Sequence, residues 1–308
     1  MSAGGERQTI PVAMWGMLAL MTLIWGVNWP ILKIVMTEIP PLRFRSWCMA
    51  IGASALFLLT WYGGGRIAVP RALWGRLVLI ALANSAGWNI LAVYGIPMMD
   101  SGRAAIIAYT FPIWATLFSV FLGEVLTRRK LTGLVLGFAA IVLLLGAEIQ
   151  AIGRAPLGAL LLLASAFTWA IGTILTKRWP LPIASSASAA WQHSIALVPV
   201  FIGAVLFESG PWAFWTLSPG PMWGLLFNAF VVFVFCLWTW LRIVAAVPPS
   251  VASLSTLAIP IVGVASGMLV LGEKPAWTDY AALLLVVGAI ATVLVPARGD
   301  PREGDARA

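Results

Sequence analysis

Long stretches without a charged residue dominate the pattern of polar and apolar positions. Ten segments of at least 17 residues contain no Asp, Glu, Lys or Arg. An α-helix of about 20 apolar residues spans the hydrocarbon core of a bilayer, so each segment predicts one membrane-spanning helix. The longest segment opens with Gly and Pro residues that predict a loop before a helix from Met222. The segments cover residues 8–32, 46–65, 77–99, 104–123, 131–147, 155–176, 179–207, 209–241, 243–272 and 280–297.

The amino-acid composition also indicates a protein that lies in a lipid bilayer. Hydrophobic residues make up 61% of the chain and charged residues only 10%, whereas a soluble domain carries about 25% charged residues. A transmembrane β-barrel would show segments of about ten residues with strict alternation, and these runs are longer and continuous. We therefore predict an all-α polytopic membrane protein with ten transmembrane helices, followed by a charged tail over 298–308.

Basic residues between the predicted helices set an orientation. Thirteen Lys and Arg residues fall on the side that carries both ends of the chain, and six, among them Arg43 and Arg45, fall on the other. Because cytoplasmic loops carry the excess of basic residues, both termini are expected in the cytoplasm. The net charge of +8 is consistent with this excess of basic residues in cytoplasmic loops. The basic residues form no clustered face, so nucleic acid is not expected as a partner.

The two halves of the sequence repeat one pattern. Three pairs of segments match in the same order, at offsets of 144 to 149 residues. Each half holds five predicted helices, an odd number, so the second half, 153–297, must enter the membrane from the opposite face to the first, 1–152. Such inverted repeats are typical of transporters. The matched segments are 25–33 with 169–177, Trp74-Gly75 with Trp223-Gly224, and 111–124 with 259–273.

These motifs resemble the drug/metabolite transporter superfamily, in particular its EamA-type ten-helix members. The resemblance rests on Trp-Gly-x-Asn at 25–28, on the segments from Pro112 to Glu124 and from Pro260 to Glu273, and on the duplication. The chain is also similar to YddG-type bacterial amino-acid exporters in length and aromatic content. The resemblance implies a bacterial inner-membrane exporter of amino acids and related metabolites. It also implies a central cavity formed by the predicted helices over 8–32, 77–99, 104–123, 155–176, 209–241 and 243–272.

Polar and aromatic residues within the predicted helices are candidates for the transport path. Polar side chains are costly in lipid and usually face the bundle interior, and aromatic rings can stack on an aromatic or apolar substrate. The alternative is that they only pack helices together. The candidates are Trp25, Asn28, Trp29, Asn84, Ser85, Trp88, Asn89, Tyr109, Trp169, Thr173, His193, Asn228, Ser253 and Thr256.

Two prolines occupy equivalent positions in the middle of predicted helices. Pro112 and Pro260 each remove an intrahelical hydrogen bond, which predicts either a pair of hinges or two static kinks. The Pro112 segment is one residue shorter than its counterpart up to the following Glu, so the end of its helix is expected to be wound differently.

Four charges at helix ends suggest gates. Lys33 and Glu273 fall on the outer side of the predicted topology, and their counterparts Lys177 and Glu124 fall on the inner side. Each pair would join the two halves and close one face. The alternative is that these are solvated charges at helix ends, since exposed pairs contribute only about 0 to 1 kcal/mol.

The predicted spans hold no charged residue at mid-depth, and His193 is their one deep titratable group. Proton-driven pumps usually place a carboxylate there, so facilitative or weakly coupled transport is expected. A neutral or zwitterionic substrate fits this interior, and an organic cation or drug held by cation–π contacts is the alternative.

Other classes of function have weaker support. No phosphate-binding loop and no metal-ligand spacing occurs, so neither a cofactor nor a metal is expected. A channel is one rival, and a serine protease that uses Ser266 with His193 is another. The sequence defines no oligomeric state, but the two least polar helices, over 131–147 and 280–297, could face lipid or a partner protomer.

Overall fold

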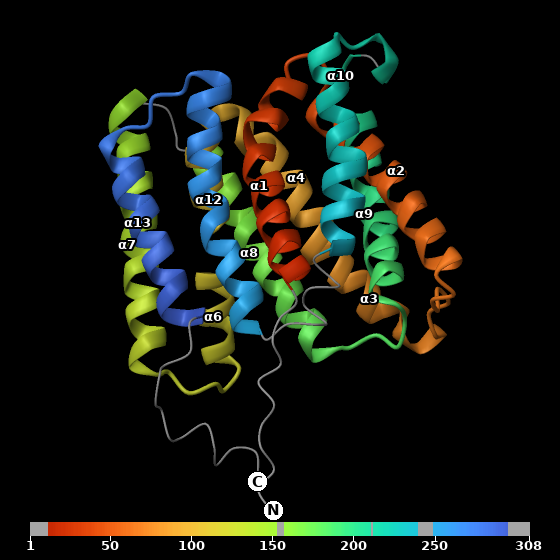
Figure 1. Ribbon diagram of the computed structural model, residues 1–308, viewed down its shortest axis with the longest axis horizontal. Helices are drawn as coiled ribbons and strands as arrows, with labels where there is room; N and C mark the ends of the chain where they lie inside the picture. Colours follow the sequence, from red (N-terminus) through yellow and green to blue (C-terminus); the bar gives the residue numbers. More distant parts are fainter. Residues whose placement is uncertain (1–11, 153–156, 211, 240–248, 295–308) are drawn as a thin grey trace, which may run out of the picture.

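The computed structural model describes residues 12–152, 157–210, 212–239 and 249–294, and within them it contains helices and no strands (Figure 1). Only the backbone is described over 12–15, 148–152, 249–257 and 293–294. The helices are α1 (Val12–Val35), α2 (Pro41–Tyr62), η1 (Arg71–Leu73), α3 (Trp74–Ile80), η2 (Ala81–Gly87), α4 (Trp88–Gly95), η3 (Ile96–Met98), α5 (Ser101–Ala108), α6 (Phe111–Phe121), α7 (Arg128–Ile152), α8 (Leu157–Arg178), α9 (Ser185–Phe207), η4 (Phe214–Thr216), α10 (Pro219–Leu226), η5 (Phe227–Cys236), α12 (Pro249–Leu271) and α13 (Trp277–Leu294).

The longer helices, and several groups of consecutive shorter ones, are long enough to cross a membrane. Eight segments in the described residues have the length and hydropathy of a membrane span, and three of the eight, Arg71–Met98, Ser101–Phe121 and Pro219–Thr239, combine several helices. The last two predicted spans coincide with the shorter apolar helices Ala258–Leu271 and Trp277–Thr292. The chain is therefore a multi-pass, all-helical membrane protein, while the count of ten crossings stays a prediction.

The second span begins earlier than its charge-free segment suggested. Helix α2 begins at Pro41, with proline in the first helical turn where its missing N–H costs nothing. Arg43 and Arg45 therefore belong to the helix rather than to a loop, and only 6% and 4% of their surface is exposed. The expectation that these two arginines lie between spans is wrong, because the charge-free search placed the start of this helix too late. Both lie near the beginning of the helix, so the expectation of no charge at mid-depth stays a prediction.

Each half of the chain also contains a π-helical segment that the sequence pattern did not predict. Segment η2 follows the Trp74-Gly75 motif within its span, and η5 follows the matching Trp223-Gly224 motif. π-Helical turns are rare and frequently occur at functional sites. Their place in both halves draws attention to the side chains they carry.

The two halves pack against each other through pairs of helices. Helix α1 packs on α12, α2 on α9, α7 on α13, and α4 with η2 on α8. Small residues allow the close approach, as membrane helices commonly require. Gly26 of α1 lies against Val262 of α12, and Gly172 of α8 lies against Asn84 of η2.

Candidate functional site

Five aromatic rings form a continuous series through the middle of the bundle, which we call the aromatic row. Trp29 contacts Tyr109 with ring centroids 6.4 Å apart, and Tyr109 contacts Phe111 at 5.7 Å. Phe111 contacts Trp169 at 6.3 Å, and Trp169 contacts Trp88 at 5.0 Å. The row joins α1, the α5–α6 junction, α8 and α4. The structure thus brings together four of the predicted path residues and adds Phe111, the first residue of the repeated segment 111–124.

The two predicted hinge prolines have different surroundings. The span that contains Pro112 is interrupted at Tyr109 and Thr110, and Pro112 lies in the first turn of the new helix α6. Pro260 lies inside the continuous helix α12. The interruption places Tyr109 between two helices, where its ring joins the aromatic row.

A polar cluster connects η2 with α9. Ser85 Oγ lies 2.9 Å from His193 Nδ1, and Asn84 Nδ2 donates to Gln192 Oε1 at 3.3 Å. The His193 ring also lies 4.9 Å from the ring of Phe233 in η5. His193 therefore lies between the two π-helical segments, which makes it the meeting point of the two halves at this depth.

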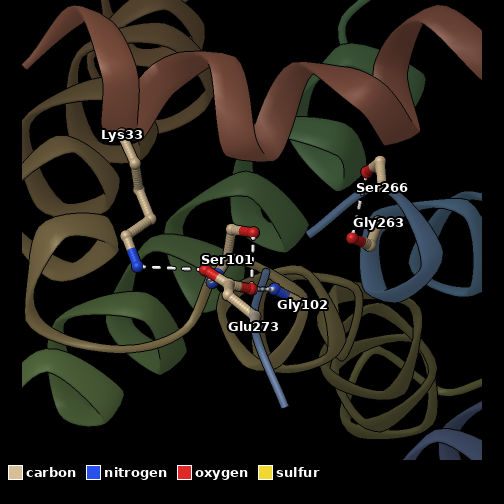
Figure 2. Close-up of polar contacts among 6 residues, drawn as sticks. All are labelled: Lys33, Ser101, Gly102, Gly263, Ser266 and Glu273. Atoms are coloured by element: carbon tan, nitrogen blue, oxygen red, sulfur yellow. Dashed lines mark hydrogen bonds and ion pairs between the residues drawn. The ribbon is translucent and has the colours of Figure 1, made fainter. Parts of the chain in front are cut away.

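Ser266, the serine considered above as a protease nucleophile, has a packing role. Ser266 Oγ donates to the carbonyl oxygens of Gly263 and Gly26, at 3.0 and 3.3 Å (Figure 2 shows the first). The hydrogen-bond partner of His193 is Ser85 instead. Ser266 thus ties α12 to α1, and the geometry gives no support to a Ser266–His193 dyad.

Three buried amide oxygens lack a hydrogen-bond partner among the described residues: Oδ1 of Asn28, Asn84 and Asn228. Ile31 of α1 lies against Gly224 of α10, and Asn28 and Asn228 each lie one turn further into the bundle from that contact. The two helices run in opposite directions, so these two amides lie at a similar depth. A buried acceptor without a partner is costly, and a ligand that carries N–H groups could satisfy it.

The remaining polar path candidates are satisfied within their own helices. Asn89 Nδ2 donates to Ser85 O at 2.8 Å, and Thr173 Oγ1 donates to Trp169 O at 2.9 Å. Trp25 packs beside Met21 and Cys236. The side chains of Ser253 and Thr256 lie outside the described residues.

One of the two predicted gate pairs is formed. Lys33 Nζ lies 3.0 Å from Glu273 Oε1 (Figure 2). The same carboxylate accepts hydrogen bonds from the Ser101 N–H at 2.7 Å, the Ser101 hydroxyl at 2.8 Å and the Gly102 N–H at 3.3 Å, and so caps the N-terminus of α5. Burial by itself would raise the pKa of Glu273, but the hydrogen bonds from Ser101, Lys33 and Gly102 outweigh it and the pKa lies below its usual value.

The other gate pair is not joined. Glu124 accepts a hydrogen bond from Lys130 at 2.8 Å, within the same half of the chain. That bond is the main reason why the pKa of Glu124 is lowered, and Lys177 adds only a longer-range attraction.

Glu208 and Glu38 link the two halves at the same end of the bundle as Glu273. Glu208 accepts hydrogen bonds from the N–H groups of Leu42 and Arg43 at 2.8 and 3.1 Å, and so caps α2. Glu38 accepts from the Ser218 N–H at 2.7 Å and its hydroxyl at 2.5 Å, and so caps α10. The Ser218 hydroxyl and N–H hold the pKa of Glu38 below its usual value.

Asp279 is the fourth carboxylate that links the two halves at this end of the bundle. It pairs with Arg103 at 2.6 Å and accepts a hydrogen bond from the Ala276 N–H at 2.7 Å. We call this end of the bundle, at the top of Figure 1, the linked face, defined by Glu38, Glu208, Glu273 and Asp279. Of these four carboxylates, only Glu273 was predicted from the sequence to join the two halves, because the other three have no matched counterpart in the repeat.

A cavity of about 530 Å³ opens on the linked face beside the Lys33–Glu273 pair, and Thr37 and Asp100 also line it. Burial and the neighbouring Glu273 raise the pKa of Asp100, and Lys33 and Arg103 partly oppose this effect. Positively and negatively charged side chains therefore lie close together at the surface of this end of the bundle.

Comparisons with known proteins define the class. The chain belongs to the EamA-like transporter family, whose model matches residues 13–146 and again residues 156–295. The resemblance read from the sequence is thereby confirmed, and the chain is a membrane transporter of this family.

Individual relatives cover most of the chain. It is 30% identical over 257 residues to the uncharacterized transporter YoaV of Bacillus subtilis, a match that covers 82% of this chain and 87% of that protein. It is 26% identical over 290 residues to a probable amino-acid metabolite efflux pump of Salmonella typhimurium, with 89% and 93% covered. It is 25% identical over 307 residues to the aromatic amino acid exporter YddG of Ancylobacter novellus, with 92% and 94% covered.

Proposed function

We propose that this transporter exports amino acids, aromatic and other neutral ones above all, and related metabolites across a bacterial inner membrane. The observation that carries the proposal is the aromatic row, which ends at Trp88, three residues from Ser85 of the polar cluster. Rings can stack on an apolar or aromatic side chain, while amides bind the polar end of the substrate. The relatives named as exporters of amino acids support the same substrate class.

Alternating access follows from the proposed architecture of ten helices in two inverted repeats, 1–152 and 153–297, with both termini in the cytoplasm. The two matches of the family model and the π-helical segment in each half support the duplication. In this orientation the linked face is the outer one.

The gate charges fit one state of such a cycle. Lys33 and Glu273 are joined, while Glu124 pairs with Lys130 instead of Lys177. We interpret this as a conformation closed on the outer face, in which Glu124 would exchange Lys130 for Lys177 when the inner face closes. Pro112 and Pro260 would act as the hinges of this exchange.

Uptake into proteoliposomes tests the proposal. Purified protein should show saturable uptake of labelled tyrosine or phenylalanine, with competition by other neutral amino acids and little acceleration by a pH gradient. Trp169→Leu in the aromatic row should reduce uptake by about tenfold or more, in line with the loss of an aromatic contact in a binding site. Trp277→Leu is the matched control, because 73% of that side chain's surface is exposed at the edge of the bundle.

Other outcomes would contradict the proposal in specific ways. Flux that rises linearly with concentration and does not saturate would indicate a channel. Saturable uptake of organic cations, with none of amino acids, would replace the substrate class and leave the family assignment intact.

A further inference from the structure

Arg45 is a buried cation with an unpartnered donor. Only 4% of its surface is exposed, and its Nε has no hydrogen-bond partner among the described residues. The guanidinium carbon lies 5.1 Å from the ring of Phe44 and 5.6 Å from the ring of Phe233. Aromatic faces attract a cation but do not satisfy its N–H groups. Inside a membrane protein such a group is costly unless an anion pairs with it.

The carboxylates at this end of the bundle are engaged elsewhere. Glu208 holds the N-terminus of α2 and the Tyr94 hydroxyl, the latter at 3.0 Å. Glu273 holds Lys33 and the N-terminus of α5. The buried neighbour Arg43 also has unpartnered donors, Nε and Nη1, but it differs from Arg45 because its Nη2 donates to the Glu208 carbonyl oxygen at 2.5 Å.

Arg45 adjoins the polar cluster that joins the two π-helical segments. Phe233, which lies beside its guanidinium, also lies 4.9 Å from His193, whose Nδ1 meets Ser85. Arg45 and His193 thus both contact the ring of Phe233. An anion beside Arg45 would therefore also lie near the His193–Ser85 pair.

Asn228 lies within one helical turn of the depth of Arg45. Helices α2 and α10 both begin at the linked face, and Gly52 of α2 meets Phe233 of η5. Arg45 and Asn228 lie seven and five residues before that contact on helices that run in the same direction. A buried donor without an acceptor, Arg45 Nε, and a buried acceptor without a donor, Asn228 Oδ1, thus lie on neighbouring helices, and their backbones differ in depth by about 3 Å, less than one helical turn.

We propose that Arg45 binds the carboxylate of the transported amino acid, and that Asn228 Oδ1 accepts a hydrogen bond from its ammonium group. The planar guanidinium suits a carboxylate, which it can bind through two parallel hydrogen bonds. The inference rests on the proposed function and narrows it, because a substrate that lacks the carboxylate would leave Arg45 unpaired. It assigns the polar end of the substrate to α2 and η5 and its side chain to the aromatic row.

Paired ligands that differ only in the carboxylate test this inference. Binding of tyrosine and of tyrosinamide to the purified full-length protein would be measured by calorimetry for wild type, Arg45→Gln, Arg45→Lys and Arg43→Gln. Wild type should prefer tyrosine. Arg45→Gln should weaken tyrosine binding on the order of 10- to 100-fold, the usual cost of losing a charge-assisted pair, and leave tyrosinamide nearly unchanged. Arg45→Lys should give an intermediate preference, because the charge stays and the two-point geometry is lost.

The controls separate this inference from a structural role and from the proposed function. Arg43→Gln removes an equally buried arginine of the same helix, and the ratio of the two affinities should not change. An unchanged ratio in Arg45→Gln, or in Arg45→Lys where the glutamine variant does not fold, would overturn the role of Arg45 and leave the amino-acid exporter intact. Folded wild type that binds neither ligand would overturn both.

Discussion

At the residue scale, Gly172 sets how closely α8 approaches the π-helical segment η2. A Cβ atom built at this position would overlap both the side chain and the backbone of Asn84. A backbone contact cannot be relieved by a change of rotamer, so the helices themselves would have to separate. Since Asn84 and Ser85 belong to η2, separation would also disturb the polar cluster.

We therefore expect Gly172→Ala to destabilise the protein by about 1–3 kcal/mol, the usual cost of overpacking. Gly146→Ala is the control, because Gly146 also lies inside a helix but has no atom within 4 Å of the added Cβ. There the helix propensity of Ala should leave the stability unchanged or raise it by up to about 1 kcal/mol. Thermal unfolding in detergent, followed by circular dichroism, measures both. Equal effects of the two substitutions would contradict the packing argument.

At the scale of helices, Glu273 has two roles that a simple ion pair would not show. It pairs with Lys33 and also caps α5 through the N–H groups of Ser101 and Gly102. Glu273→Gln should therefore increase the rate at which the linked face opens by about tenfold, because the carboxylate accepts hydrogen bonds from several donors. Lys33→Gln should increase this rate only a few-fold. The double charge reversal, Lys33→Glu with Glu273→Lys, should not restore closure, because a lysine would face the positive end of α5.

The labelling rate of Val264→Cys measures this opening. Val264 is 5% exposed and packs on Gly102, directly beneath the cap. The background would carry Cys48→Ala and Cys236→Ala to remove the two native thiols. Full closure in the double reversal, or equal rates in the two glutamine variants, would show that Glu273 acts through Lys33 alone.

Sequence patterns predicted the all-helical membrane fold and four of the five residues of the aromatic row for clear physical reasons. Trp29, Trp88, Tyr109 and Trp169 were predictable because large aromatic residues in apolar helices stand out beside small and polar ones. The π-helical segments were not, because a π turn leaves no composition signal in an apolar run. The capping roles of Glu208 and Glu38 were equally hidden, since each depends on a helix more than 160 residues away in sequence. Arg45 was placed in a loop because a charge-free search ends a span at its first charge.

At the scale of the whole molecule, the four carboxylates of the linked face all join the first half of the chain to the second. Glu38 and Arg103 come from the first half, while Glu208, Glu273 and Asp279 come from the second. At the opposite end, the Lys130–Glu124 pair lies within one half. Among the described carboxylates, those that join the two halves thus gather at the linked face, which is the arrangement that a carrier closed on that side requires.

This arrangement predicts how acid acts on the linked face. Glu273 and Glu38 both have a pKa lowered from the usual value of about 4.5, so their contribution to closure is complete above that value and is lost as the pH falls through the lowered values. Asp100 has a raised pKa, and its protonation removes a negative charge beside Glu273 and does not weaken the Lys33 pair.

Spin labels at Thr37→Cys and Lys274→Cys, one exposed site from each half on the linked face, report the opening as a distance. In the Cys48→Ala, Cys236→Ala background, the distance distribution should stay constant from about pH 8 to about pH 5.5 and lengthen below about pH 4. Adding Glu273→Gln should make the distribution broad at every pH and remove most of the transition. Opening between pH 8 and pH 6 would instead identify a group that titrates near neutrality, since carboxylates with lowered pKa values remain ionised throughout that range.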